Sequence, residues 1–126
     1  SCLLHDISKP QTREEADGKV TFFGHAEHGA ERMPEYALRL GFTDLQAAEL
    51  AWLVRHHMNT YDLLPSGKRS GWAAKTRLEL YDHPAWPLLV MLQRADALGT
   101  WLDPEGKTTA EPLADQFEAD RITLFA

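Results

Sequence analysis

The chain has 126 residues, of which 44% are hydrophobic and 25% charged, as expected for one globular domain with its own core. Its formal charge of −6 argues against non-specific binding to a nucleic-acid backbone. No apolar run approaches the ~20 residues that a membrane span needs, and no signal-peptide pattern is present. We therefore predict a cytoplasmic protein with no membrane partner. The single cysteine, Cys2, lies in an apolar run and is predicted to be a small core residue.

The first residues are predicted to close a helix. Residues 1–4 resemble the last turns of a helix whose start is absent, and Pro10 would stop it. We therefore expect further protein, with an additional domain, upstream of residue 1. Residues 11–24 are mostly polar, and an Asp17-Gly18 turn precedes a short apolar run. This stretch predicts a loop with a short strand pair.

Apolar residues at three- and four-residue spacing predict two helices in the next part of the chain. The first covers residues 25–40, with a kink or break expected near Pro34. Thr43 and Gln46 have the spacing of a capping box and open the second helix, which runs to about Met58. Its apolar stripe consists of Ala47, Leu50, Ala51, Val54 and Met58.

Further helices are predicted in the second half. Residues 61–71 are expected to form a loop and residues 72–80 a short helix. Pro84 suits the first turn of a longer helix, whose spacing places Asp96 on or beside the buried face.

A turn-rich connection at residues 100–109 leads to a last helix that carries Phe117 and Ile122 on its apolar side. The whole pattern predicts an all-α fold of five to six helices, with a short extended segment near residues 17–24. We expect residues 1–126 to form a single domain that lacks its N-terminal helix.

Residues that bind metals collect at the predicted helix ends and on one inward face. A carboxylate on an apolar face is costly unless it is paired or metal-bound. Histidine and aspartate together suit divalent ions such as Mg, Mn, Fe, Co, Ni or Zn. Adjacent histidines on a helix point about 100° apart and rarely serve one packing face, which favours a site. The predicted ligands are His5, Asp6, His25, His56, His57 and Asp96.

Other polar residues have simpler interpretations. His28 lies one helical turn after His25 and is interpreted as a solvated residue outside the site. Arg55 is interpreted as a solvated charge and Asp44 as a helix-cap residue. Ser8 has no evident base partner except the proposed ligands, so a serine hydrolase is not predicted.

Four ordered motifs resemble the HD-domain phosphohydrolase superfamily. They are LHDISKP at residues 4–10, Gly24-His25 with Gly29-Ala30, LVRHHM at residues 53–58, and RADA at residues 94–97. Within the superfamily they look like the HD domain of bacterial tRNA nucleotidyltransferases and poly(A)-polymerase-like proteins. The likeness covers about residues 3–99.

The resemblance implies a role for each predicted ligand. His5, Asp6 and Asp96 match the residues that bind the principal metal ion. His25, His56 and His57 match positions that bind a second ion in dinuclear members. One or two divalent ions per chain are therefore expected.

The resemblance also places Lys9 near the substrate phosphate, and it shows two departures from the family pattern. The family motif begins with a histidine on an upstream helix that this sequence does not include. Ser8 replaces the usual glycine, which is expected to alter the packing of the turn without removing a ligand.

The residues themselves support phosphoester hydrolysis. A metal ion held by His and Asp can polarise a phosphoryl oxygen and lower the pKa of bound water toward ~7. Lys9 would offset the developing charge, so Lys9 and Asp6 are the predicted catalytic residues. We predict a metal-dependent phosphohydrolase acting on a nucleotide or RNA-end phosphoester, such as a 2′,3′-cyclic phosphate or a phosphomonoester. The alternatives are a non-catalytic, metal-stabilised HD module that assists RNA binding by a neighbouring nucleotidyltransferase or kinase domain, and a di-iron oxygenase.

Overall fold

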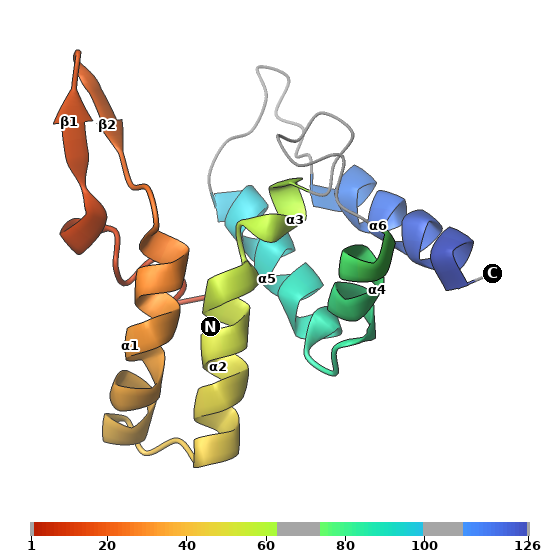
Figure 1. Cartoon of the computed structure of the whole chain (residues 1–126), viewed down its shortest axis with the longest axis horizontal. Coiled ribbons are helices and arrows are strands. Elements are labelled where there is room, and N and C mark those ends of the chain that lie inside the picture. Colours follow the sequence, from red (N-terminus) through yellow and green to blue (C-terminus); the bar gives the residue numbers. More distant parts are fainter. Residues whose placement is uncertain (1, 63–73, 100–109, 126) are drawn as a thin grey trace. The chain divides into compact units, whose positions relative to one another are not determined.

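The computed structural model describes residues 2–62, 74–99 and 110–125, which form mostly helices and one small sheet (Figure 1). The predicted all-α fold is confirmed. The chain divides into two compact units, which are described separately: Ser1–His57 and Met58–Ala126. Within the described residues, no helix has both the length and the apolar character needed to cross a membrane.

Residues 2–9 fold as turns, so the helix end predicted there is wrong. Ile7 N–H donates to the Leu4 carbonyl at 3.1 Å and Lys9 N–H to the Asp6 carbonyl at 3.0 Å. These bonds span three residues rather than the four of an α-helix. Pro10 starts a short 3₁₀ helix, Pro10–Thr12, instead of ending one, because its fixed φ suits a first helical position.

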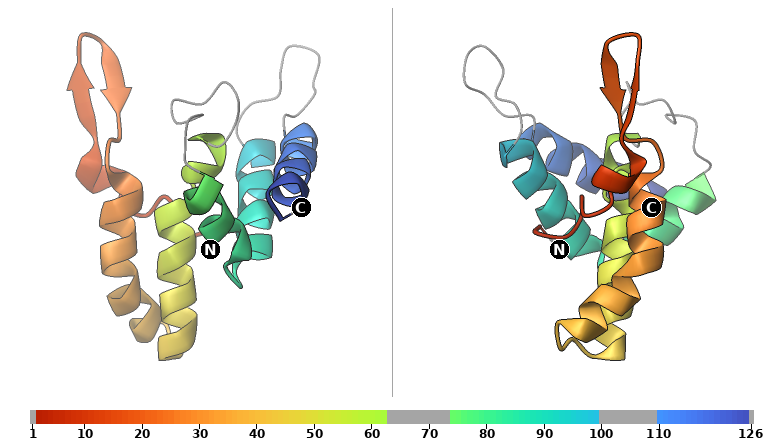
Figure 2. Two further views of the ribbon diagram at one scale, coloured as in Figure 1. Left: turned by 45° about the vertical axis from the view of Figure 1, so that its right-hand side comes forward. Right: turned by 90° about the vertical axis from the view of Figure 1, so that its left-hand side faces the viewer.

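A small β-hairpin follows and confirms the predicted strand pair. Strands β1 (Glu14–Ala16) and β2 (Lys19–Thr21) are antiparallel, with Glu15 opposite Val20. Asp17 and Gly18 both have positive φ, 52° and 72°, as a two-residue turn between twisted strands requires. The hairpin projects beyond the N-terminal end of the first long helix (Figures 1 and 2).

Helices α1 (His25–Arg39) and α2 (Asp44–His56) run antiparallel, side by side (Figure 1). Helix α1 continues through Pro34, so the expected break is wrong. Pro34 lies on the exposed face of α1, so its ring takes no space in the buried core. The capping box of α2 is confirmed: Gln46 N–H donates to Thr43 Oγ1 at 3.2 Å, and Thr43 N–H donates to Gln46 Oε1 at 3.0 Å.

The core between α1 and α2 also holds the N-terminal turns. Met33 and Val54 are fully buried in it, and Leu4 and Ile7 pack against it. Leu4 and Ile7 flank the His5-Asp6 pair in sequence. Burying these two side chains therefore fixes the pair beside the start of α1 and the end of α2.

Three residues predicted to be apolar core residues are exposed. Cys2 is exposed because it lies in a turn and not on a buried helix face. Met58 is 40% exposed, since α2 ends at His56 and the helical phase of its stripe is lost. Ile122 is 59% exposed, while Phe117 is buried as predicted. Five helical residues turn a side chain by about 500°, which puts Ile122 on another face.

The second unit contains α3 (Asn59–Asp62), α4 (Ala74–Asp82), α5 (Trp86–Gly99) and α6 (Ala110–Phe125). Helix α3 includes two residues that were predicted to begin a loop. The rest of that loop and the connection predicted at residues 100–109 lie outside the described residues. Asp96 is half-buried on α5, as its place beside the buried face predicted.

Aromatic packing and one carboxylate tie this second unit together. Trp86 meets Tyr81 and Phe117 edge-on, with ring centroids 4.8 and 5.7 Å apart. Asp120 on α6 accepts hydrogen bonds from Arg77 and Tyr81 on α4, at 2.6 and 2.5 Å. Burial and the Asp120 carboxylate raise the pKa of Tyr81, so its hydroxyl stays a neutral donor.

Candidate metal centre

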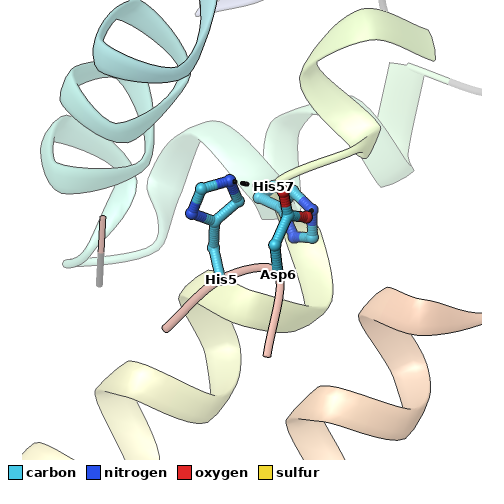
Figure 3. A group of neighbouring side chains, drawn as sticks. All are labelled: His5, Asp6 and His57. Carbon is cyan, nitrogen blue, oxygen red and sulfur yellow. Dashed lines mark ion pairs between the residues drawn. The ribbon is translucent and has the colours of Figure 1, made fainter. Parts of the chain in front are cut away.

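Three histidines and one aspartate converge where α1 begins and α2 ends. Figure 3 shows three of these side chains, His5 and Asp6 from the N-terminal turns and His57 from the C-cap of α2. His25, the first residue of α1, is the fourth. The Nε2 atoms of His5, His25 and His57 lie 3.3, 3.4 and 3.6 Å from the Asp6 carboxylate oxygens. We call these four residues the His-Asp cluster.

Each histidine of the cluster is oriented by a backbone carbonyl. A carbonyl oxygen can only accept, so the Nδ1 atom that faces it carries the proton. The neutral rings then present Nε2 lone pairs to Asp6, as metal-binding histidines with a hydrogen-bonded outer partner do. The Nδ1 donors and their acceptors are His5 to Cys2 at 2.9 Å, His25 to Phe22 at 2.8 Å, and His57 to Val54 at 2.6 Å.

This arrangement of donors fits a divalent cation. The Nε2 atoms of His25 and His57 are 3.1 Å apart, and both are acceptors when Nδ1 holds the proton. Two lone pairs at that separation repel each other and the nearby carboxylate, unless a positive charge lies between or near them. A neutral imidazole nitrogen and a carboxylate oxygen are ligands that Zn, Ni, Co, Fe and Mn accept.

Burial and neighbouring charges favour an ionised Asp6 and a neutral His57. Burial disfavours the imidazolium and lowers the pKa of His57, and the nearby His5 and His25 lower it further. Burial alone would raise the pKa of Asp6. The hydrogen bond from Lys9 and its positive charge act against that effect, and the pKa of Asp6 is lowered. Asp6 is therefore a carboxylate and His57 a neutral ring near pH 7.

Lys9 lies at the edge of the cluster. Its Nζ atom is 2.6 Å from Asp6 Oδ2 and 5.6 Å from the centroid of the Phe22 ring. The side chain is 39% exposed, so the ammonium group is accessible from solvent. A substrate oxyanion near Asp6 would therefore meet a positive charge, which is the role that the family resemblance implies for Lys9.

Two predicted ligands lie outside these contacts. The ring of His56 packs on that of Trp52, one turn earlier on α2, at a centroid distance of 4.8 Å. Adjacent helical residues point in different directions, which explains why His57 and not His56 joins the cluster. Asp96 belongs to the second unit. Metal binding by His56 and by Asp96 stays a prediction.

Sequence reasoning missed the hydrogen bond between Ser8 and His28. His28 was interpreted as solvated, but its Nδ1 is 2.9 Å from Ser8 Oγ and its ring is half-buried. Ser8 therefore has a histidine partner outside the predicted ligands. The hydroxyl is unsuited to be a nucleophile because Ser8 is only 2% exposed. Two features of the sequence could have indicated this bond. Position 8 has a serine where the family usually has a glycine, and His28 lies three residues after the predicted ligand His25.

The comparisons with known proteins agree with this geometry. The CC-adding tRNA nucleotidyltransferase of Thermus thermophilus is 37% identical over 102 residues, which cover 79% of this chain and 22% of that protein. The chain thus spans about a fifth of the length of this curated relative. No solved structure gives a significant match. The model of the family described as "HD domain" matches residues 1–101, and the chain therefore belongs to the HD domain family.

Proposed function

We propose that this chain is a metal-dependent phosphohydrolase that acts on nucleotide or RNA-end phosphoesters in the cytoplasm. The observation that carries the proposal is the convergence of three histidine Nε2 atoms on the Asp6 carboxylate. Each ring is held with its lone pair inward by a carbonyl bond, so the ligands are preorganised. The relative is a tRNA nucleotidyltransferase, which supports a nucleotide or RNA end as substrate.

The chain's own residues have distinct parts in this proposal. A divalent ion in the cluster would supply Lewis acidity toward a phosphoryl oxygen and an acidic bound water. Asp6 would keep one oxygen on the ion and one near Lys9, since its two oxygens face different partners. Lys9 would act as a point charge on the phosphoryl oxygens. His5, His25 and His57 would hold the ion without exchanging protons, because their Nδ1 atoms already donate to carbonyls.

Hydrolysis of defined substrates tests the proposal. Protein loaded with Mn²⁺, Ni²⁺ or Co²⁺ is incubated with 2′,3′-cyclic nucleotides, nucleoside monophosphates and a generic phosphodiester. We expect turnover that Asp6→Asn abolishes. Glu49→Gln, an exposed carboxylate on α2, is the matched control and should leave turnover unchanged. Absence of turnover with every ion and substrate, in protein that binds the ion, contradicts the proposal.

A second function is favoured by the relative and its coverage. The chain matches 22% of a tRNA nucleotidyltransferase, so a non-catalytic, metal-stabilised module that helps a neighbouring domain hold RNA is the alternative. Asp96→Ala separates the two functions, given that Asp96 is proposed as a ligand of the principal ion. The enzyme proposal expects lost hydrolysis in a folded protein. The module proposal expects lower stability, with RNA binding retained by the refolded protein.

A further inference from the structure

We propose that Ser8 and His28 form a positioning pair that holds the turn carrying Asp6 and Lys9 against α1. This inference rests on the proposed metal site and deepens it. Ser8 Oγ and His28 Nδ1 are hydrogen-bonded at 2.9 Å. The bond joins residues 20 positions apart, one in the N-terminal turns and one on a helix, and so it fixes tertiary geometry.

Helix α1 contacts the cluster and the turn through residues one helical turn apart. His25 presents Nε2 to Asp6 Oδ1 at 3.4 Å, and His28, three residues later, bonds to Ser8. Residues three apart on a helix are neighbours on its surface. Helix α1 thus lies beside the chain on both sides of Ile7, at Asp6 and at Ser8. It holds the turn through the Ser8–His28 hydrogen bond, and loss of that bond would let the distance between Asp6 and His25 change.

Ser8 is also held by its backbone and by close packing. Its carbonyl accepts from Thr12 N–H at 3.2 Å and from Thr12 Oγ1 at 2.9 Å. A Cβ added at Gly29 would lie 3.6 Å from Ser8 Oγ and 3.0 Å from Val54 Cγ1, which shows how closely α1 approaches the turn. In such a buried place a hydroxyl needs a partner, and His28 supplies it.

The serine at position 8 fits this turn without backbone strain. Among the non-glycine residues that the structure describes, only Asp17 has a positive φ, so Ser8 has none. A glycine is therefore not required here for its backbone freedom. The serine hydroxyl instead makes a hydrogen bond to His28 that a glycine cannot make. The consequence is that Lys9 and Asp6, on either side of the pair Ile7-Ser8, are held at fixed distances from His25.

Co²⁺ binding to Ser8→Ala, His28→Ala and the double variant tests the pair. We expect each single variant to bind Co²⁺ about 10-fold more weakly, the lower end of what loss of an outer-shell partner costs. The double variant should be no weaker than either single variant, because one shared bond is lost. The visible spectrum of bound Co²⁺ should change in all three, since ligand geometry relaxes. Additive losses, or unchanged affinity and spectrum, overturn the proposal.

Two conservative variants at position 28 separate positioning from general packing. The Asn amide lies close to where Nδ1 of His lies and can donate or accept, so His28→Asn should restore binding and spectrum. The Gln amide lies one bond farther out, near Nε2, so His28→Gln should behave like His28→Ala. Equal effects of Asn and Gln contradict a specific Ser8 bond.

Amide hydrogen exchange of the metal-free protein tests the Ser8–His28 pair without relying on the proposed function. If the unaltered protein binds no Co²⁺, the proposed metal site fails by that result alone. The pair is then still judged by the Lys9 and Thr12 amides, whose hydrogen bonds form the turn. We expect Ser8→Ala and His28→Ala to speed their exchange equally, with His28→Asn close to the unaltered protein. Unchanged exchange at both amides contradicts the positioning role.

Discussion

Single hydrogen atoms on imidazole rings decide what the His-Asp cluster can bind. In His5, His25 and His57 the proton lies on Nδ1 because a backbone carbonyl accepts it. The Nε2 lone pairs consequently face Asp6 instead of solvent. Histidine and aspartate residue types were readable from the sequence, but the carbonyls that select the tautomer were not.

Lys9 is expected to stabilise charge on the substrate and not to support binding of the metal ion. Lys9→Met keeps the apolar stem and removes the ammonium group that contacts Asp6 Oδ2. We predict that kcat/KM for phosphoester hydrolysis falls about 10²-fold, as for loss of one charge-stabilising donor. Metal affinity should not fall, because Nζ contacts Oδ2, while Oδ1, which faces His25 and His57, would stay on the ion. Lys75→Met, an exposed lysine on α4, is the control. A parallel loss of metal binding in Lys9→Met would instead make Lys9 a support for Asp6.

The lowered pKa of His57 predicts that the metal-free first unit loses stability in mild acid. Burial keeps the folded pKa below the ordinary 6.5, so the unfolded chain binds a proton that the folded chain rejects. The free energy of unfolding should therefore fall as pH drops below about 6.5, and level off below the folded pKa. Asp6 contributes in the same direction, in a lower window below its ordinary 3.8.

Urea unfolding between about pH 7 and pH 5 measures this dependence. His57→Gln should flatten the slope relative to the unaltered protein, whatever its absolute stability. The two proteins differ only at position 57, so the difference between their slopes reports on His57. Identical slopes in the two proteins would show that His57 is not the group responsible.

At the scale of elements, α1 and α2 form the support on which the site is built. The capping box starts α2 at the end far from the cluster, and the C-cap of α2 is His57 itself. The first residue of α1 is His25, which follows Gly24 at a positive φ of 74°. Two helix termini therefore bring two predicted ligands to one place, and the buried core between the helices sets their separation.

Two substitutions at opposite ends of this helix pair should differ in effect. Gly29→Ala would place Cβ 3.0 Å from Val54 Cγ1, a fully buried side chain, and overpacking of this kind costs about 1–3 kcal/mol. Thr43→Ala removes one cap and costs about 1 kcal/mol. Both should lower the free energy of unfolding. Only Gly29→Ala should also weaken metal binding, because it displaces α1 from the Ser8 turn. Equal metal affinity in the two variants would contradict that link.

Helix existence was predictable where local signals agreed. The capping box at Thr43 and Gln46 gave the start of α2, and its apolar stripe placed the end at about Met58, close to the observed end at His56. The N-terminal turns were misjudged because their shape depends on Leu4 and Ile7 packing on a distant core. The Ser8–His28 bond escaped for the same reason, since it joins segments whose approach no local pattern encodes. The residue types of the predicted ligands could be recognised in the sequence, but their convergence could be seen only in the folded structure.

At the scale of the whole molecule, the HD match extends over both compact units, from residue 1 to residue 101. Four of the six predicted ligands gather in the first unit, and Asp96 belongs to the second. Metal binding by Asp96 stays a prediction, and the outcome of the Asp96→Ala variant described above decides between enzyme and module.

Nitrogen-15 NMR of the histidine side chains during a Zn²⁺ titration measures whether the His-Asp cluster binds a divalent ion through Nε2. We predict that Zn²⁺ shifts the Nε2 resonances of His5, His25 and His57 together, at one equivalent, while their Nδ1 atoms stay protonated. Asp6→Asn should weaken the response at all three rings. Unperturbed Nε2 resonances, or zinc bound through Nδ1, would show that these nitrogens do not form the metal site.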